Sequence, residues 1–298
     1  MKTKKKNTFA FHLMLLIPTI FLFIYCYVPM FGIVIAFLDY KPALGFLGSK
    51  FVGFEHFRAL FNNPNFAQAF ENTVIIAFWK IVWGMFVPVS FALLLNEVRN
   101  TVFKRISQTV IYMPYFISWV LMSGIIIDIF SPSNGVINQF LEMFGVEPIF
   151  FLGSNKWFRP ILIITNIWKE FGWGTIVYMA ALTGIDPNLY EAASIDGADR
   201  WQQTIHITLP GILPTVVLML TLSLGNVLNA GFDQIFNLMS PITMESGDII
   251  DTMVYRLGME NAKYGLSTAA GLFKSVISTF FIVVSYKLAY KFSGYRVF

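Results

Sequence analysis

The sequence predicts an all-α membrane protein that crosses the bilayer six times, on three grounds: its composition, its long apolar segments and the placement of its basic residues. Of 298 residues, 56% are hydrophobic and 17% aromatic, whereas only 13% are charged, against about 25% in an ordinary soluble domain. The mean hydropathy is +0.64. A soluble fold of this size has too little interior to bury so much apolar surface. The composition therefore excludes a soluble enzyme and a disordered chain, and the thinly spread basic residues exclude a nucleic-acid binder.

Six apolar segments are long enough to cross about 30 Å of hydrocarbon, which takes about 20 helical residues. The first follows a basic start and contains His12 as its only ionisable residue. It is about twice as long as the apolar part of a signal peptide, and no small-residue cleavage site follows it, so we expect an uncleaved anchor. The six spans are expected at residues 10–38, 72–95, 106–130, 160–183, 210–236 and 266–290.

The basic residues predict the orientation of the chain. Segments on the N-terminal side of the membrane contain 11 Lys and Arg residues, and segments on the opposite side contain 7. This excess predicts that both termini are cytoplasmic. We expect a basic cytoplasmic tail over 1–9, a six-helix transmembrane domain over 10–291 and a second cytoplasmic tail over 292–298. Two of the three long outer loops are expected to contain a short helix, over 54–61 and 136–144, and the third, over 237–264, is expected to be a solvated stretch.

The cytoplasmic loop over 184–209 is predicted to form a helix, a glycine turn and a second helix. Asp186 followed by Pro187 indicates a helix start, because aspartate caps the first amides and proline fits the first helical turn. Gly197 breaks this helix. A second helix follows, and Pro210 is expected to end it and to begin the fifth span.

The same loop contains a motif with fixed spacing: Glu-Ala-Ala, three residues, Gly, nine residues, then Ile-x-Leu-Pro. This motif resembles the signature of the permeases of importer-type ABC transporters. The surrounding sequence over 196–210 is similar to the carbohydrate-uptake branch, from which Thr204 departs because a bulkier apolar residue is usual there. The segments 96–119 and 225–235 are similar to permeases that import oligosaccharides such as aldouronates. The fixed positions are Glu191, Ala192, Ala193, Gly197, Ile207, Leu209 and Pro210.

The resemblance implies an importer-type ABC permease fold with cytoplasmic coupling helices, in the cytoplasmic membrane of a bacterium. It implies a complex with a second homologous permease as a heterodimer, two copies of an ABC ATPase subunit and an extracytoplasmic solute-binding protein that delivers a sugar. ATP and Mg are expected on the ATPase subunits. The chain itself is expected to be no enzyme and to bind no cofactor, because it lacks the G-x-x-x-x-G-K-[ST] loop that cradles phosphates.

Coupling to the ATPases is expected through the same loop. In the family, the glutamate of the motif contacts a basic residue of the ATPase, which makes Glu191 the first candidate. Gly197 is expected to set the angle between the two short helices, since a Cβ atom disfavours a turn with positive φ. The coupling candidates are Glu191, Ala192, Ala193, Asp196, Gly197, Ile207, Leu209 and Pro210.

Polar and aromatic side chains within the spans predict the sugar path, because polar groups in a membrane usually face the bundle interior or a cavity. On the fifth span, Asn226, Asn229 and Asp233 have the spacing of one helix face. The alternative for the asparagines is a hydrogen bond to a neighbouring helix, and for the tryptophans an anchor at the membrane interface. The candidates for the substrate path are Asn226, Asn229, Asp233, Gln234, Asn166, Glu170, Trp173, Lys80 and Trp119.

Two other functions stay open from the sequence. An ion-coupled secondary transporter is expected to have inverted repeats with carboxylates near the membrane midplane, and no such repeat stands out. An ABC permease for a polyol or glycerol phosphate has the same motif, but phosphate favours arginine and no arginine lies within a span. Lys80 and Lys274 could instead serve a uronate. No metal site is expected, because the chain has one cysteine and its three histidines are scattered.

Overall fold

The computed structural model describes the backbone of residues 3–293 and the side chains of residues 11–287. The chain forms two units, Met1–Asn63 with Val254–Phe273 and Pro64–Met253 with Lys274–Phe298. In the described residues, strands occur only in a short hairpin, and the rest of the regular structure is helical. The predicted all-α class is confirmed.

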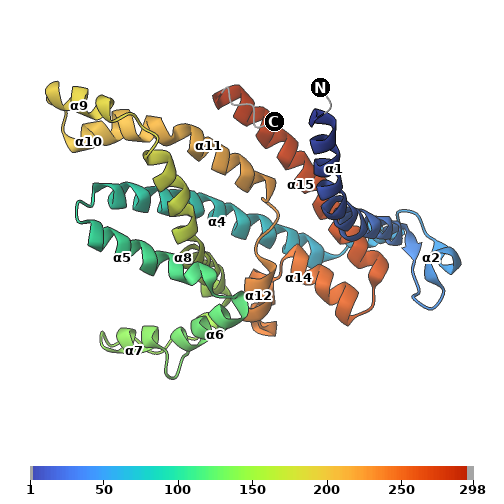
Figure 1. Ribbon diagram of the computed structural model, residues 1–298. Helices are drawn as coiled ribbons and strands as arrows, with labels where there is room; N and C mark the ends of the chain where they lie inside the picture. Colours follow the sequence, from blue (N-terminus) through green and yellow to red (C-terminus); the bar gives the residue numbers. More distant parts are fainter. Residues whose placement is uncertain (1–2, 294–298) are drawn as a thin grey trace. The chain divides into compact units, whose positions relative to one another are not determined.

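The first unit begins with a long apolar helix (Figure 1). α1 (Thr3–Leu22) continues through a π-helical turn (Phe23–Tyr27) into a 3-10 helix (Val28–Phe37). The stretch Phe11–Phe37 is long and apolar enough to cross a membrane, and almost all of its side chains are exposed within the chain. An apolar surface of this kind suits contact with lipid, and its bounds agree with the first span predicted at 10–38.

A small cap follows this helix in the first unit. β1 (Leu38–Asp39) pairs antiparallel with β2 (Lys50–Phe51), and α2 (Gly45–Gly48) lies between the two strands. α3 (Glu55–Phe61) confirms the short helix predicted for this outer loop. The unit also includes a π-helical turn (Arg256–Glu260) and the first turns of α15 (Tyr264–Ser293).

Two long helices form the centre of the second unit, α4 (Pro64–Glu97) and α8 (Asn155–Leu182), which pack along each other (Figure 1). Their contact is close because a glycine on α8 faces it: a Cβ at Gly174 would lie 3.0 Å from Pro88 of α4. A different face of α8 approaches α5 (Thr101–Tyr112), where a Cβ at Gly172 would clash with the Ile111 carbonyl. The buried core beside them includes Ile76, Met122, Ile126, Phe158, Leu162 and Ile235.

The third predicted span, over 106–130, is wrong as one continuous helix. α5 ends in a 3-10 turn (Met113–Phe116), and α6 (Trp119–Ile129) leaves at an angle of 105°. Between them Ile117 and Ser118 are extended, and the Ser118 hydroxyl accepts a hydrogen bond from an amide of the first turn of α6. This serine cap begins a new helix in a stretch whose apolar composition favours a single one.

The observed helix differs from the predicted fifth span, 210–236, at both ends. α10 (Arg200–Gln203) passes through a π-helical turn (Thr204–Thr208) directly into α11 (Leu209–Gly225), so Pro210 does not end a helix as expected. A π-helical turn adds a residue to the helix just before the proline, where a regular α-helix is disrupted by the proline ring. Residues 226–231 are not helical, and α12 (Phe232–Leu238) is separate from α11. The prediction of one span over 210–236 is therefore wrong beyond residue 225.

Four helices of the described chain are long and apolar enough to cross a membrane, or five if the bent pair is one span. α8, the predicted fourth span, is not among them and contains Lys169 and Glu170. With α8 included, the helices are compatible with six spans. α7 (Val136–Glu142) confirms the short helix predicted over 136–144. The remaining helices are α7 (Val136–Glu142), α9 (Pro187–Ile195), α12 (Phe232–Leu238), α13 (Met244–Gly247) and α14 (Ile250–Tyr255), with 3-10 turns at Phe151–Gly153 and Pro241–Thr243.

Candidate functional site

The loop that carries the motif forms the predicted helix, turn and helix. The Asp186 carboxylate accepts a hydrogen bond from the Asn188 amide at 3.0 Å and caps α9, with Pro187 in the first turn. α9 ends before Gly197, whose φ is +80°. A Cβ there would meet no atom within 4 Å, so the backbone conformation and not crowding favours glycine at this position.

Side-chain hydrogen bonds hold the two helices of the loop together. Asp199 and Gln202 form a reciprocal capping box that begins α10. The Tyr190 hydroxyl of α9 lies 3.0 Å from the Thr208 hydroxyl in the π-helical turn. Gln203 donates from its side-chain amide to the Ser194 hydroxyl at 3.0 Å. The two helices therefore form one locally ordered element.

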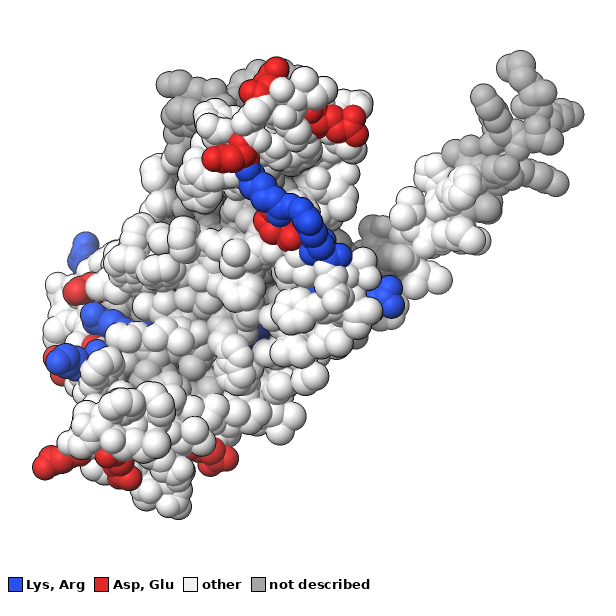
Figure 2. All heavy atoms as spheres, turned by 90° about the vertical axis from the view of Figure 1, so that its left-hand side faces the viewer, with Lys and Arg blue, Asp and Glu red and all other residues white. Residues whose placement is uncertain are grey.

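The surface of this loop is exposed and partly apolar. Trp201 is 71% exposed and Ile195 87% exposed, so the loop presents large apolar side chains at its surface. Figure 2 shows acidic and basic side chains near one another at the end of the molecule that carries α9 and α10. The motif positions Glu191, Ala192, Asp196, Gly197, Leu209 and Pro210 are exposed, and Ala193 and Ile207 are half-buried. A surface of this composition is typical of a protein interface.

An ion pair connects this loop to α4, and sequence reasoning missed it. Arg200 of α10 donates from Nη1 to Glu97 Oε2 in the last turn of α4 at 2.7 Å. A polar cavity of about 320 Å³ lies around the pair and is also lined by Asn96, Arg99 and Tyr190. The two charges are 103 residues apart, so no local sequence pattern signals the contact.

A second cavity, of about 430 Å³, lies between α4, α8 and the end of α11. It brings together five of the residues predicted for the sugar path: Lys80, Asn166, Glu170, Asn226 and Asn229. Apolar and small residues complete the lining, among them Ile81, Gly84, Met219 and Ser223. A concave site of this size, with a few converging polar groups, is the usual form of a small-ligand site.

The other four predicted path residues do not line this cavity. Asp233 is exposed on α12 and, because the chain is not helical before it, does not continue the face of the asparagines as predicted. Trp173 stacks on Tyr115 with ring centroids 5.0 Å apart. Trp119 packs against the buried core. Gln234 is buried and bonds to Lys80 beside the cavity.

Lys80 forms hydrogen bonds that stabilise the non-helical segment 226–231, the break between α11 and α12. Its Nζ donates to the Ala230 carbonyl at 2.7 Å and to Gln234 Oε1 at 2.5 Å. The Gln234 amide in turn donates to the Leu162 carbonyl and to the Thr165 hydroxyl of α8, both at 2.9 Å. The break is thus held by α4 and α8 through a lysine and a glutamine that are 154 residues apart in the sequence.

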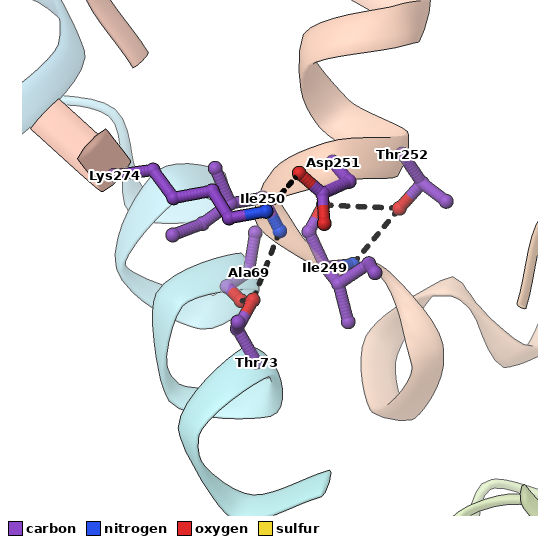
Figure 3. A network of polar contacts seen from close by, with 7 residues as sticks. All are labelled: Ala69, Thr73, Ile249, Ile250, Asp251, Thr252 and Lys274. Carbon is purple, nitrogen blue, oxygen red and sulfur yellow. Dashed lines mark hydrogen bonds and ion pairs between the residues drawn. The ribbon is translucent and has the colours of Figure 1, made fainter. Parts of the chain in front are cut away.

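Two further lysines have structural partners. Lys169 is buried on α8 and donates to the Tyr115 carbonyl at 2.7 Å, which supports the 3-10 turn at the bend after α5. Lys274, which the sequence left without a partner, lies 2.5 Å from Asp251 Oδ1 (Figure 3). Beside that pair, the Thr73 hydroxyl of α4 accepts a hydrogen bond from the Ile250 amide at 2.9 Å. Lys274 thus has a carboxylate partner within the described chain, unlike Lys80.

A polar network near the start of α8 was also not predicted from the sequence. Arg159 donates from Nη2 to Asn72 Oδ1 at 2.6 Å and from Nε to the Ser246 carbonyl at 3.0 Å. The fully buried Asn72 amide donates to the Asp248 carbonyl at 2.9 Å. These bonds join α4 and α8 to the segment that contains α13. Within the described residues, no group of three or more His, Cys, Asp or Glu side chains is placed to hold a metal ion.

A family model described as the binding-protein-dependent transport system inner membrane component matches residues 81–293, which include the motif loop and most of the cavity lining. The chain belongs to this family. It is therefore a membrane-inserted permease subunit of an ABC importer and not itself an enzyme. This membership decides against the ion-coupled secondary transporter.

Several similar proteins are named for the transport of polysaccharides. The polygalacturonan/rhamnogalacturonan transport system permease protein YteP of Bacillus subtilis is 43% identical over 281 residues, which cover 94% of this chain and 88% of the relative. A solved bacterial ABC transporter involved in the import of the acidic polysaccharide alginate matches with a TM-score of 0.90 and 39% identity, over 96% of this chain and 97% of that chain. A bacterial alginate ABC transporter in complex with an alginate pentasaccharide-bound periplasmic protein matches with a TM-score of 0.89 and 39% identity, over 96% of each chain.

Proposed function

We propose that this permease translocates an acidic oligosaccharide, with uronate units, through the cavity of the second unit. The observation that carries the proposal is the cavity lining. Amide side chains of Asn166, Asn226 and Asn229 surround a space that also has one lysine and one glutamate. Amides both donate and accept hydrogen bonds and so suit sugar hydroxyls. The relatives that are 43% and 39% identical are named for polymers of acidic sugars, which supports the acidic class.

A polyol or glycerol phosphate is the weaker substrate hypothesis. Phosphate is usually bound by arginine, which matches its geometry with two parallel hydrogen bonds. No arginine lines the cavity among the described residues, and Arg159 of α8 is bonded to Asn72 away from it. The cavity chemistry therefore favours hydroxyl and carboxylate groups.

Coupling through the motif loop is the second part of the proposal. The ATPase subunit contacts the exposed helices α9 and α10, and Glu191 pairs with a basic residue of the ATPase. Ala192 and Ala193 leave room for close approach, Gly197 sets the angle of the turn, and Ile207, Leu209 and Pro210 join the loop to α11. Asp196 ends α9 beside Gly197. The exposed Trp201 and Ile195 support a protein partner at this surface.

The proposed assembly has the permease beside a second homologous permease as a heterodimer, in the cytoplasmic membrane of a bacterium. Two ATPase copies bind ATP and Mg on the cytoplasmic side, and an extracytoplasmic binding protein delivers the sugar. Both termini are cytoplasmic, with the tails 1–9 and 292–298 flanking the transmembrane domain 10–291. The bias of Lys and Arg residues supports this orientation.

The test is to purify the tagged chain with the products of its neighbouring genes and to identify its partners by mass spectrometry. We expect a second permease and an ATPase. The complex is then reconstituted in liposomes with its binding protein, and ATP-driven uptake of trigalacturonate and of maltotriose is compared. Uptake of the acidic trisaccharide supports the proposal. Uptake of maltotriose alone, or uptake driven by an ion gradient without ATP, overturns it.

A further inference from the structure

We infer that Lys80 is the residue of this permease that recognises a carboxylate of the substrate and so selects acidic over neutral oligosaccharides. The inference rests on the proposed function of the cavity and names the group that sets its charge preference. It begins from the position of the lysine. Lys80 lies near the middle of α4 and lines the cavity together with the three asparagines.

The hydrogen bonds of Lys80 leave part of its binding capacity unused. An ammonium group has three N–H donors. In the described structure two of them have partners, the Ala230 carbonyl at 2.7 Å and Gln234 Oε1 at 2.5 Å. Both partners are neutral oxygens, so they orient the ammonium without cancelling its charge. The third donor is available to a group inside the cavity.

Lys80 differs from the other charged groups near the cavity because it has no ion-pair partner in the described chain. The described residues that line the cavity include two charged side chains, Lys80 and Glu170. Glu170 has a cation of its own, because its Oε1 lies 3.9 Å from the Nζ of Lys169. No carboxylate of the described chain lies within ion-pair distance of Lys80, whereas Lys274 is neutralised by Asp251. Among the described residues, Lys80 is therefore the cation of the cavity with no carboxylate within ion-pair distance, and the charge of Glu170 acts on it from farther away.

A charge withdrawn from water is costly unless an opposite charge or several hydrogen bonds compensate it. The carboxylate of a uronate supplies that compensation, and a neutral sugar does not. The hydroxyls on the same sugar unit find amide partners nearby in Asn226 and Asn229. Acidic substrates thus gain a charge-assisted hydrogen bond that neutral substrates of the same size lack.

The backbone at Gly231 leaves room for the ammonium group of Lys80. Gly231 has φ of +97°, and a Cβ on it would lie 2.9 Å from the Lys80 Nζ. Any larger residue at this position pushes against the ammonium. A glycine at the break therefore lets Lys80 reach the cavity while it remains bonded to Ala230.

The experiment measures equilibrium binding of radiolabelled trigalacturonate and of its methyl ester to the purified permease complex, without the binding protein. The ester has the same sugar units but no charge. We expect wild type to prefer the acid at least tenfold, and Lys80→Met to abolish that preference. Lys80→Arg, which retains the positive charge, is expected to stay within about threefold of the wild-type ratio. Lys156→Met, which removes an exposed lysine outside the cavity, is the matched control and is expected to keep the full ratio.

The outcomes separate the inference from the proposed function. If the complex takes up trigalacturonate but Lys80→Met keeps the wild-type binding ratio, Lys80 is not the selector and the proposed function stands. If wild type transports only neutral sugars, the proposed function itself fails. Lys80→Gln, which retains an amide donor for the Ala230 carbonyl, serves if the methionine variant does not assemble. If both neutral variants fail to assemble, or lose acid and ester equally, Lys80 only holds the break and the inference is overturned.

Discussion

Arg200 Nη1 lies 2.7 Å from Glu97 Oε2, and this contact ties the motif loop to the C-terminal end of α4. The same helix presents Lys80 to the cavity, 17 residues earlier in the sequence. The ion pair therefore stands at one end of a helix whose middle contributes to the proposed substrate site. A displacement of α10 is therefore expected to reach α4 through this pair.

The first prediction concerns that ion pair. The two side chains are 59% and 50% exposed, so Arg200→Glu is expected to lower the free energy of unfolding by about 1 kcal/mol or less. Transport per ATP hydrolysed is expected to fall much more, because the loop and α4 then repel each other. The exchange variant Glu97→Arg/Arg200→Glu restores the attraction. Recovery of transport in the exchange variant, measured in liposomes, supports the link, and equal defects in the single and exchange variants contradict it.

The second prediction concerns the turn at Gly197. Its φ of +80° makes Gly197→Val strained by about 1–2 kcal/mol. We expect the variant to fold but to retain less ATPase during purification, as judged by the ATPase-to-permease ratio. Gly145→Val is the matched control, since Gly145 has φ of +76° and an open surrounding in the outer loop. Equal loss of ATPase from both variants would mean that strain alone, and not the coupling turn, is responsible.

The third prediction concerns Glu191, which is exposed on α9. Glu191→Ala removes no contact that helps to fold the chain, so the unfolding temperature is expected to stay within about 2 °C of wild type. Sugar-stimulated ATP hydrolysis is expected to fall severalfold, because the variant lacks the carboxylate proposed to pair with the ATPase. Glu142→Ala at the end of the outer helix α7 is the control. An assembled Glu191→Ala complex that transports at the wild-type rate rules out the proposed role.

The fourth prediction concerns the ion pair of Lys274 and Asp251, whose side chains are 21% and 22% exposed. Removal of one partner leaves the other charge poorly solvated, so Lys274→Met or Asp251→Leu alone is expected to cost about 1–3 kcal/mol of stability. The double variant is expected to be more stable than either single one, because no unpaired charge remains. Thermal unfolding in detergent checks this order. Additive losses in the double variant would show that the pairing itself is unimportant.

Much of the fold could be predicted because the signals were local. The first span is a continuous apolar run, and the structure places it at Phe11–Phe37. The start of α9 at Asp186 and the break at Gly197 follow from residue types with specific backbone preferences. Such features depend on a few neighbouring residues and not on the rest of the chain.

The breaks in the third and fifth spans could not be predicted, because distant residues stabilise them. The bend before α6 is supported by Lys169, which bonds to the Tyr115 carbonyl from 54 residues away. The break after α11 is supported by Lys80 of α4. Local signals exist at both places, Pro114 before the bend and Gly231 after α11, but each stands within a mainly apolar stretch that predicts a continuous span. A buried lysine that reaches a backbone carbonyl is a tertiary effect, and periodicity cannot reveal it.

The sequence did identify the cavity residues, but for a partly incorrect reason. Asn226 and Asn229 were selected as members of one helix face together with Asp233, yet the chain leaves the helix at residue 226. They line the cavity because the unwound segment turns them toward α4 and α8. The rarity of polar groups in a membrane span was thus a better guide than the assumed helical geometry.

The uninterrupted passage from α10 through the π-helical turn into α11 gives the chain a single rod of 26 residues, Arg200–Gly225. At 1.5 Å per residue its length is about 39 Å. Trp201 lies near one end of this rod, and Asn226 directly follows the other. A rotation of the helix at Trp201 is therefore transmitted along one continuous rod to Asn226, which lines the cavity.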